Sequence, residues 1–391
     1  MKILIVEDNK DKLGAIVDLV KSTNPDIDVI TCDVLVDFVA LVNKEKFDLL
    51  VTDLLLPVVR GRDPEDVTMN IIETARGFDS LNIQTPVIAI TQFMASAETN
   101  YKDLNRHDIN IITYSSDSED WKDPFVKKLL SCTPKIRYDF IIICALPKEA
   151  DAYTAAGYTD NKTTIQHGLS CNKITIDDFT GLVIVPPRMG LVNASIVSAR
   201  AIDIFEPRVI CMSGICAGIE GKANIYDIVI PSQCDQHDSG KWTNEGFVSE
   251  SYSVPLEHEI QLTIDKLIKQ KDLVEEIGKG VVLDRSEMVG ESGNLDVNIY
   301  LAPTSSGSSV IADDSMLQQI TTQHRKKNAF EMESYALYEA ARQSPLKPSY
   351  FSAKAVVDNG DSQKGDNYHR VAALISAKAV YGILRRLLQD R

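Results

Sequence analysis

The sequence predicts a chain of two α/β domains. Its 391 residues exceed the length over which a single hydrophobic core usually grows. Residues 1–130 alternate short apolar runs with helix-like segments, and a second series of the same kind starts at residue 138. The composition, with 44% hydrophobic and 25% charged residues, is typical of globular domains.

The first domain is expected to contain five strands. Helix-like patterns separate the apolar runs, as over residues 10–20 and in the stretch that ends at residue 42. Alternating strands and helices form a doubly wound parallel sheet with right-handed crossovers. The expected strands are residues 3–6, 28–31, 49–52, 87–91 and 109–113.

Three carboxylates of the first domain follow expected strands. Glu7 and Asp8 come after the first strand, and Asp53 comes after the third. The carboxyl ends of parallel strands meet at one edge of the sheet, where open α/β folds place their sites. Clustered carboxylates repel one another unless a cation lies among them, and oxygen ligands of this kind suit Mg²⁺.

Residues 1–130, with these carboxylates, resemble a response-regulator receiver domain. The acidic pair, the VTDLLLP segment with Asp53, and Thr91 at the end of the fourth strand carry the resemblance. It implies that a sensor histidine kinase or phosphotransfer protein phosphorylates Asp53, that Glu7, Asp8 and Asp53 hold Mg²⁺, and that Thr91 is the switch hydroxyl.

Two features depart from the receiver pattern. Receivers usually carry Lys-Pro directly after the fifth strand, whereas this chain reads TYSSDSEDWKDPF, so Lys122 is the candidate for the lysine role. The loop after Asp53 is lengthened by a charged run at residues 60–66. The alternative is an inert receiver that serves only as a dimerisation platform.

Residues 131–137 form the expected linker, and residues 138–391 form a second α/β domain with helices on both faces of a larger mixed sheet. Its strands are expected at 140–144, 173–177, 182–185, 209–213, 228–231, 280–283 and 350–357, and its helices at 193–205, 257–269, 332–342 and 370–388.

Several short segments of the second domain carry candidate chemistry. CALPKEA places Glu149 just after a buried strand, and MSGICAGIEG has glycines that allow close approach of backbone N–H groups to a ligand oxygen. AFEMESYAL contains Glu331 and Glu333, and AKAVVDNG ends an apolar strand at Asp358. Each segment alone has an ordinary structural explanation, such as helix capping or turn formation.

Together, in order and spacing, these segments resemble the nucleoside phosphorylase and nucleosidase superfamily over residues 138–388. The nearest likeness is to methylthioadenosine/S-adenosylhomocysteine nucleosidase. The matching residues are Ala145, Leu146 and Glu149 in the first motif, Ser213, Gly214, Ala217 and Gly218 in the second, and Glu331, Met332, Glu333 and Asp358 in the last two.

The resemblance implies cleavage of an N-glycosidic bond, in which positive charge builds on the ribose and negative charge on the leaving purine. Asp358 is then the acid at purine N7, and Glu149 the base on the attacking water. Glu333 binds the ribose hydroxyls, and Met332 packs against the sugar. Because a carboxylate would repel a phosphate nucleophile, Glu149 favours hydrolysis, while Arg188 keeps a phosphorylase as the alternative.

The substrate-binding residues follow from the same likeness. Phe330, with Val310 and Ile311, is expected to contact the base. His237 and Lys241, with Arg285 as a further candidate, are expected to face phosphates, and a solvated loop is the alternative. Receiver–nucleosidase fusions resemble effectors of phosphorelay-type bacterial antiviral systems, which implies adenine nucleotides such as ATP as substrate, with adenine and ribose phosphate as products.

The remaining expectations come from bulk properties. A formal net charge of −15 argues against a nucleic-acid partner. The seven scattered cysteines, the lack of a signal peptide and the lack of a membrane-spanning run predict a cytoplasmic protein. We expect a homo-oligomer by analogy with both families. A non-catalytic nucleotide-binding module is a third hypothesis, against which the complete set of Glu149, Glu333 and Asp358 argues.

Overall fold

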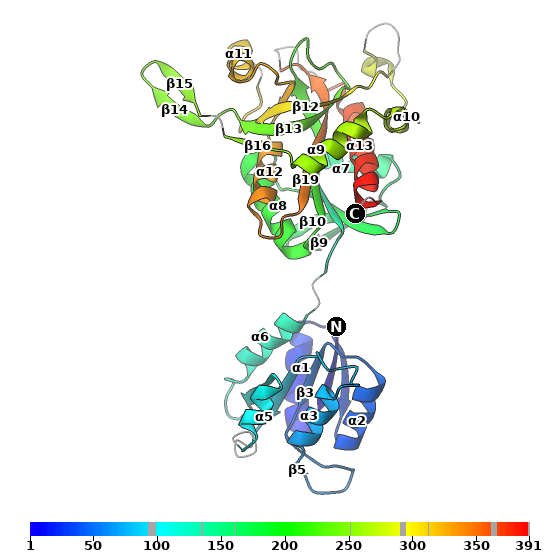
Figure 1. Ribbon diagram of the computed structural model, residues 1–391, viewed down its shortest axis with the longest axis vertical. Helices are drawn as coiled ribbons and strands as arrows, with labels where there is room; N and C mark the ends of the chain where they lie inside the picture. The colour runs from blue at the N-terminus through cyan, green and yellow to red at the C-terminus, as the bar shows by residue number, and fades with distance from the viewer. Residues whose placement is uncertain are drawn as a thin grey trace. The chain divides into compact units, whose positions relative to one another are not determined.

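The chain divides into two compact units, Met1–Lys135 (unit 1) and Ile136–Arg391 (unit 2). The computed structural model describes residues 1–92, 99–133, 136–160, 162–250, 252–289, 295–311, 313–360 and 366–389 (Figure 1). Residues 134 and 135 of the expected linker lie outside the described residues.

Unit 1 contains the predicted five-stranded parallel sheet, in the order β2-β1-β3-β6-β7. Its strands are β1 (Lys2–Val6), β2 (Asp28–Cys32), β3 (Leu49–Thr52), β6 (Val87–Thr91) and β7 (Ile109–Thr113). The described helices are α1 (Lys10–Thr23), α2 (Leu35–Lys44), α3 (Thr68–Arg76), α5 (Tyr101–Arg106) and α6 (Lys122–Cys132). The lengthened loop after Asp53 pairs β4 (Leu55–Leu56) with β5 (Glu65–Asp66).

The start of α1 determines which side chains reach the sheet edge of unit 1. The Asn9 side chain accepts hydrogen bonds from the backbone N–H groups of Asp11 and Lys12, which caps the helix. Lys12, Ile16 and Val20 follow at helical spacing and are the buried residues of α1. A lysine therefore lies on the face of α1 that packs against the sheet.

Unit 2 contains a ten-stranded mixed sheet in the order β16-β13-β17-β18-β12-β8-β11-β10-β9, with β19 paired to β12 and β13. The strands of this sheet are β8 (Phe140–Cys144), β9 (Thr163–Gln166), β10 (Leu169–Ile176), β11 (Phe179–Val185), β12 (Val209–Gly218), β13 (Ile228–Gln236), β16 (Ser253–Pro255), β17 (Ile299–Ser306), β18 (Ala329–Glu331) and β19 (Ser349–Asp358). The predicted larger mixed sheet is confirmed.

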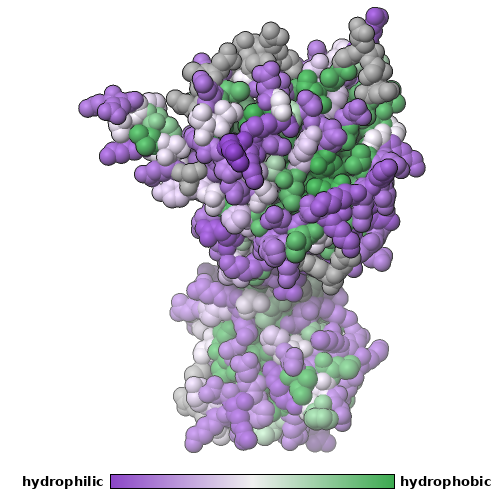
Figure 2. Space-filling model, turned by 45° about the horizontal axis from the view of Figure 1, so that its top comes forward, coloured by the Kyte–Doolittle hydropathy of each residue, from purple (hydrophilic) through white to green (hydrophobic). Residues whose placement is uncertain are grey.

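Helices cover the sheet of unit 2. Helix α13 (His369–Gln389) packs against β12, β19 and α7 (Pro147–Ala155), whereas α8 (Leu191–Phe205) packs against α12 (Ser334–Gln343). The other helical segments are α9 (His258–Ile268), α10 (Lys271–Gly278), η1 (Arg285–Glu287) and α11 (Asp314–Gln323). The hairpin of β14 (Gly240–Thr243) and β15 (Gly246–Ser249) projects from unit 2 (Figure 1). In Figure 2 hydrophobic residues gather in one patch of unit 2, while hydrophilic residues cover most of the visible surface.

One predicted strand is wrong. Residues 280–283 belong to no strand: Val281 and Leu283 pack on the core, while Val282 is 73% exposed. The segment is extended and packs on the core through every second side chain, but no neighbouring strand pairs with it in the described part of the chain. Among the described helices, none is both long enough and apolar enough to cross a membrane.

Candidate active site

Unit 2 has a cavity of about 380 Å³ at the carboxyl ends of its central strands. It gathers residues from all the motifs except the His237–Lys241 segment. Residues in its wall that the motifs named are Ala145, Leu146, Glu149, Ala217, Val310, Ile311, Phe330, Glu331, Met332, Glu333 and Asp358, and the other wall residues are Met189, Ile215, Cys216, Ser309, Val357, Asp366 and His369.

Glu149 lies in the first turn of α7 and is almost fully buried in the cavity wall. Its Oε2 accepts a hydrogen bond from the Leu146 N–H, and its Oε1 accepts one from the Ile215 N–H, both at 3.0 Å. Burial raises the pKa of Glu149 to about 7, although the Lys354 ammonium opposes the increase. A carboxyl group that titrates near neutrality can accept a proton from water at physiological pH.

The Gly-rich segment supports Glu149, and its Ile215, Cys216 and Ala217 lie in the cavity wall, so that its contact with a ligand stays a prediction. A Cβ atom on Gly214 would lie 2.3 Å from Glu149 Oε1, so only glycine fits beside the carboxylate. The Gly214 N–H donates to Ser376 Oγ at 2.8 Å, and Ser213 is fully buried with its Oγ 2.9 Å from the same hydroxyl. Gly218 lies close to the Ala223 carbonyl oxygen, where a Cβ would clash.

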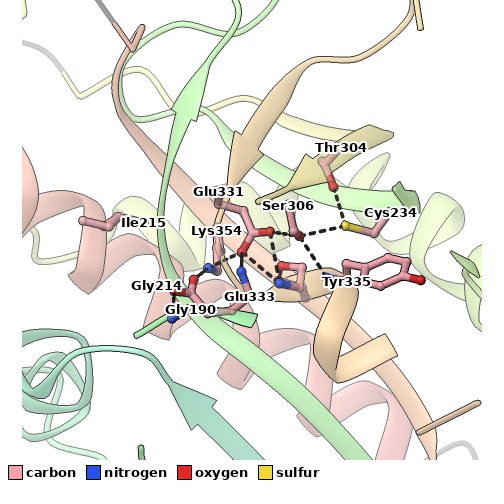
Figure 3. Close-up of polar contacts among 12 residues, drawn as sticks. Gly190, Gly214, Ile215, Cys234, Thr304, Ser306, Glu331, Glu333, Tyr335 and Lys354 are labelled. Carbon is pink, nitrogen blue, oxygen red and sulfur yellow. Dashed lines mark hydrogen bonds and ion pairs between the residues drawn. The ribbon is translucent and has the colours of Figure 1, made fainter. Parts of the chain in front are cut away.

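A buried lysine that the motifs did not indicate joins the two glutamates of the Glu-Met-Glu motif (Figure 3). Lys354, from β19, is 2% exposed, and its Nζ donates to Glu333 Oε2 at 2.7 Å and to Glu331 Oε2. Burial lowers the pKa of Lys354, but the carboxylates of Glu331, Glu333 and Glu149 outweigh burial and hold it well above its usual value. Lys354 is therefore the fixed cation of the site.

Glu331 organises the loop that carries Met332 and Glu333. It accepts hydrogen bonds from the N–H groups of Glu333 and Ser334 and from the Ser306 hydroxyl (Figure 3). Burial raises the pKa of Glu331, but Lys354 and these hydrogen bonds outweigh it, and the net shift is downward. With its oxygens so occupied, Glu331 positions its neighbours, and Glu333 is the better placed to bind a substrate.

Glu333 lies at the N-terminus of α12 and faces the cavity. Its Oε1 accepts the Gly190 N–H at 2.9 Å, and its Oε2 accepts the Lys354 ammonium. These two contacts fix the carboxylate beside Met332, as the predicted role in binding ribose hydroxyls requires.

Asp358 ends β19, where the pairing with β12 shifts register after Cys216. Its Oδ1 accepts a hydrogen bond from the Gly360 N–H at 2.7 Å, as expected for a turn at Asp-Asn-Gly. The same residue also lies in the cavity wall. Phe330, which we expected to contact the base, lies against Gly360 on this side of the cavity.

The residues expected to face phosphates do not meet in the cavity wall. His237 is buried, its Nδ1 lies 3.0 Å from Ser305 Oγ, and burial holds its pKa below the usual value. It lines a neighbouring cavity with Trp242 and Phe247 rather than the cavity that holds Glu149. Lys241 is exposed on the projecting hairpin, and Arg188 and Arg285 are also exposed.

A model of the phosphorylase superfamily matches residues 139–389, which is more than half of the chain. The chain belongs to the phosphorylase superfamily. The superfamily predicted from the motifs is thereby confirmed, and the relatives named below include nucleosidases, as the motifs predicted.

The relatives cover the chain to different extents. An uncharacterised protein of Sinorhizobium fredii is 23% identical in an alignment that covers 98% of this chain and 99% of that protein. The ATP nucleosidase Cap17 of Escherichia coli is 24% identical over 61% of this chain, which spans about half (49%) of that protein. A 5'-methylthioadenosine/S-adenosylhomocysteine nucleosidase of Exiguobacterium is 22% identical over 53% of this chain and 82% of its own length.

Solved structures agree with the superfamily fold. The 5'-methylthioadenosine/S-adenosylhomocysteine nucleosidase of Helicobacter pylori superposes with a TM-score of 0.51 at 14% identity, over 64% of this chain and 99% of that one. Futalosine hydrolase of the same organism gives 0.50 at 13% identity, over 63% and 97%.

Unit 1 also places a lysine among its carboxylates. Lys12 Nζ lies 2.7 Å from Glu7 Oε2 and 2.6 Å from Asp53 Oδ2, and Lys12 is 1% exposed. Burial raises the pKa of Glu7 to about 7, and Lys12 opposes the shift. Lys122, the residue we expected beside Asp53, is instead paired with Glu119 at the start of α6. Tyr114 follows β7, with its ring centre 5.7 Å from Lys12 Nζ.

The carboxylates of unit 1 do not fit the predicted Mg²⁺ site as they stand. The Lys12 ammonium already occupies the space between Glu7 and Asp53, and Asp53 Oδ1 accepts the Leu54 N–H. Asp8 is half-buried nearby, and Thr91 is buried at the end of β6. In the described part of the chain, no group of three or more Asp, Glu, His or Cys side chains is arranged to hold a metal ion.

Proposed function

We propose that unit 2 is a purine nucleotide N-glycosidase that hydrolyses the bond between base and ribose. One observation carries the proposal: a single cavity gathers Glu149 from α7, Glu333 from the start of α12 and Asp358 from the end of β19. Oxocarbenium chemistry needs an anion beside the sugar, a base for water and a donor for the leaving group.

The proposed reaction assigns one task to each carboxyl group. As the bond from C1′ to the purine breaks, Glu333 stabilises the positive ribose and binds its hydroxyl groups, with Met332 against the sugar. Asp358 gives its proton to N7, so the base leaves as a neutral purine. Water forms the new bond to C1′ and gives its proton to Glu149, whose pKa of about 7 suits that transfer.

Adenine nucleotides are the proposed substrates, with adenine and a ribose phosphate as products. The support is the similarity to the Escherichia coli protein named ATP nucleosidase, together with an apolar base side formed by Phe330, Val310 and Ile311. Methylthioadenosine and S-adenosylhomocysteine are the alternative substrates, since nucleosidases of that name are also similar.

The test is release of free adenine from ATP, AMP, adenosine and methylthioadenosine by the purified protein, followed by chromatography. The Asp358→Asn variant should release adenine at least about 100-fold more slowly, the usual scale of general acid catalysis. If no base is released from any of the four, with or without acetyl phosphate, the proposal is wrong.

The phosphorylase alternative makes a different prediction for the products. It requires inorganic phosphate and yields ribose 1-phosphate, and it has weak support because Arg188 is exposed rather than in the cavity wall. The measurement is adenine release with and without phosphate. A non-catalytic binding module would bind nucleotide and release no adenine.

We further propose that unit 1 is a receiver that regulates unit 2. Support comes from the five-stranded parallel order and from Asp53 at the carboxyl end of β3, beside Glu7. The proposal includes a sensor kinase or phosphotransfer protein as partner. It also includes a role in antiviral defence and assembly into a homo-oligomer. Intact-mass measurement after treatment with acetyl phosphate should detect one added phosphoryl group, which Asp53→Asn should lack. An unmodified wild-type mass would support the inert platform instead.

A further inference from the structure

The cavity is large enough for a nucleoside but leaves the 5′-phosphates of a nucleotide unaccounted for. A volume of about 380 Å³ is near the lower end of small-molecule pockets. Five acidic residues line it, namely Glu149, Glu331, Glu333, Asp358 and the exposed Asp366, and the buried ammonium of Lys354 pairs with two of them. A phosphate chain would be repelled from that interior and must lie at the rim.

The position of each part of a nucleotide follows from the proposed roles. The base lies toward Phe330 and Asp358, and the ribose lies against Met332 and Glu333. Part of the remaining wall is formed by Leu146, Met189, His369 and Asp366, and we assign the 5′ substituent to this part.

Two basic residues lie close in sequence to this part of the wall, and one of them contacts a wall residue. Lys148 is exposed two residues after Leu146, and its Nζ contacts His369 Nδ1. Arg188 is exposed directly before Met189. Within the described residues, neither Lys148 nor Arg188 has a carboxylate at ion-pair distance, whereas His369 lies 3.1 Å from the exposed Asp366. In the described part of the chain these two cationic side chains thus have no ion-pair partner, although Lys148 is hydrogen-bonded to His369.

We infer that Lys148 and Arg188 form a phosphate-binding rim that selects 5′-phosphorylated nucleosides over neutral ones. This rests on the proposed N-glycosidase function and adds the residues that distinguish its substrates. It also moves phosphate recognition from the expected His237 and Lys241 to the side of the cavity next to Leu146 and Met189. Charged hydrogen bonds to phosphate oxygens would supply the selectivity.

The experiment compares kcat/KM for ATP, AMP and adenosine in the wild type and in the Lys148→Ala and Arg188→Ala variants. Each substitution should lower the ratio of ATP to adenosine efficiency by about tenfold or more, the usual worth of a charged hydrogen bond. Raising the salt concentration should lower the same ratio in the wild type, because exposed charges are screened. The control is Lys162→Ala, an exposed lysine beside Asp160, which should leave the ratio unchanged.

The outcomes separate the two proposals. If adenine is released but the ratio is the same in both variants and the wild type, the rim assignment is wrong and the N-glycosidase proposal stands. If none of the substrates releases adenine, the N-glycosidase proposal itself fails. A ratio that falls equally in the Lys162→Ala control would also overturn the assignment.

Discussion

Replacement of Glu149 by glutamine should abolish activity and, at alkaline pH, stabilise unit 2. The pKa of Glu149 is raised by burial from 4.5 to about 7. Below pH 4.5 the folded and unfolded chains both hold the proton, and the group contributes nothing to stability. Between pH 4.5 and about 7 this group is ionised only in the unfolded chain. The loss of folding stability therefore grows with pH and reaches its full size above about pH 7.

The shift sets the magnitude of the effect. At about 1.4 kcal/mol per pKa unit, the ionised group destabilises the fold by about 3 kcal/mol at pH 8 and by less than about 1 kcal/mol at pH 5. Glutamine does not titrate, and its altered hydrogen bonds with Leu146 and Ile215 contribute equally at both pH values. The difference in unfolding free energy between variant and wild type should thus be about 2–3 kcal/mol larger at pH 8 than at pH 5.

Thermal unfolding at the two pH values measures this difference. For a domain of this size the extra gain corresponds to a rise in the melting midpoint of roughly 5–10 °C, compared between variant and wild type at each pH. In parallel, kcat/KM of the wild type should rise with pH through about 7, because the base must be ionised. An equal midpoint shift at pH 5 and pH 8, or a flat pH profile of activity, would refute the assignment of Glu149.

Three other substitutions test the remaining contacts. Gly214→Ala should reduce kcat/KM by about 100-fold or more, because the new Cβ lies 2.3 Å from Glu149 Oε1. The control is Gly221→Ala, which also has positive φ but no neighbour within 4 Å, and it should keep its activity. Lys354→Met should destabilise the protein by about 3–5 kcal/mol in urea unfolding, because it leaves buried carboxylates without their cation; a loss below about 1 kcal/mol would contradict the ion-pair argument. Lys12→Met should create a binding site for Mn²⁺, detected by electron paramagnetic resonance, that the wild type and the exposed-site variant Lys44→Met lack. Tight Mn²⁺ binding by the wild type, lost in Asp53→Asn, would show that Lys12 does not block the cation.

Much of the fold was predictable because buried strands leave a strong pattern. The inner strands β1, β3 and β6 of unit 1 and most central strands of unit 2 are short apolar runs, since both faces of their sheets are covered. Residues 280–283 show the limit of that pattern: an apolar run shows burial, but not whether another strand is there to pair with it.

The site residues that sequence reasoning missed were visible in principle. Lys354 lies inside the apolar run of β19, and a lysine in a strand buried on both faces must have an acidic partner. Lys12 occurs at helical spacing with Ile16 and Val20, on the apolar stripe of α1. The role of Gly214 was not accessible in this way, because it depends on which atom of a distant helix approaches β12.

Lys354 and Lys12 solve the same electrostatic problem with different consequences. Carboxylates gathered at strand ends repel one another, and an ammonium from a neighbouring element neutralises them in each unit. In unit 2 Lys354 bonds directly to Glu331 and Glu333 but not to Glu149, so the pKa of Glu331 is lowered while that of Glu149 rises to about 7. When two carboxyl groups of a site have different pKa values, the one with the lower pKa can stabilise positive charge and the one with the higher pKa can transfer a proton. In unit 1 Lys12 instead bonds to the proposed phosphoacceptor itself, so a phosphoryl group on Asp53 would meet a cation that the fold already supplies.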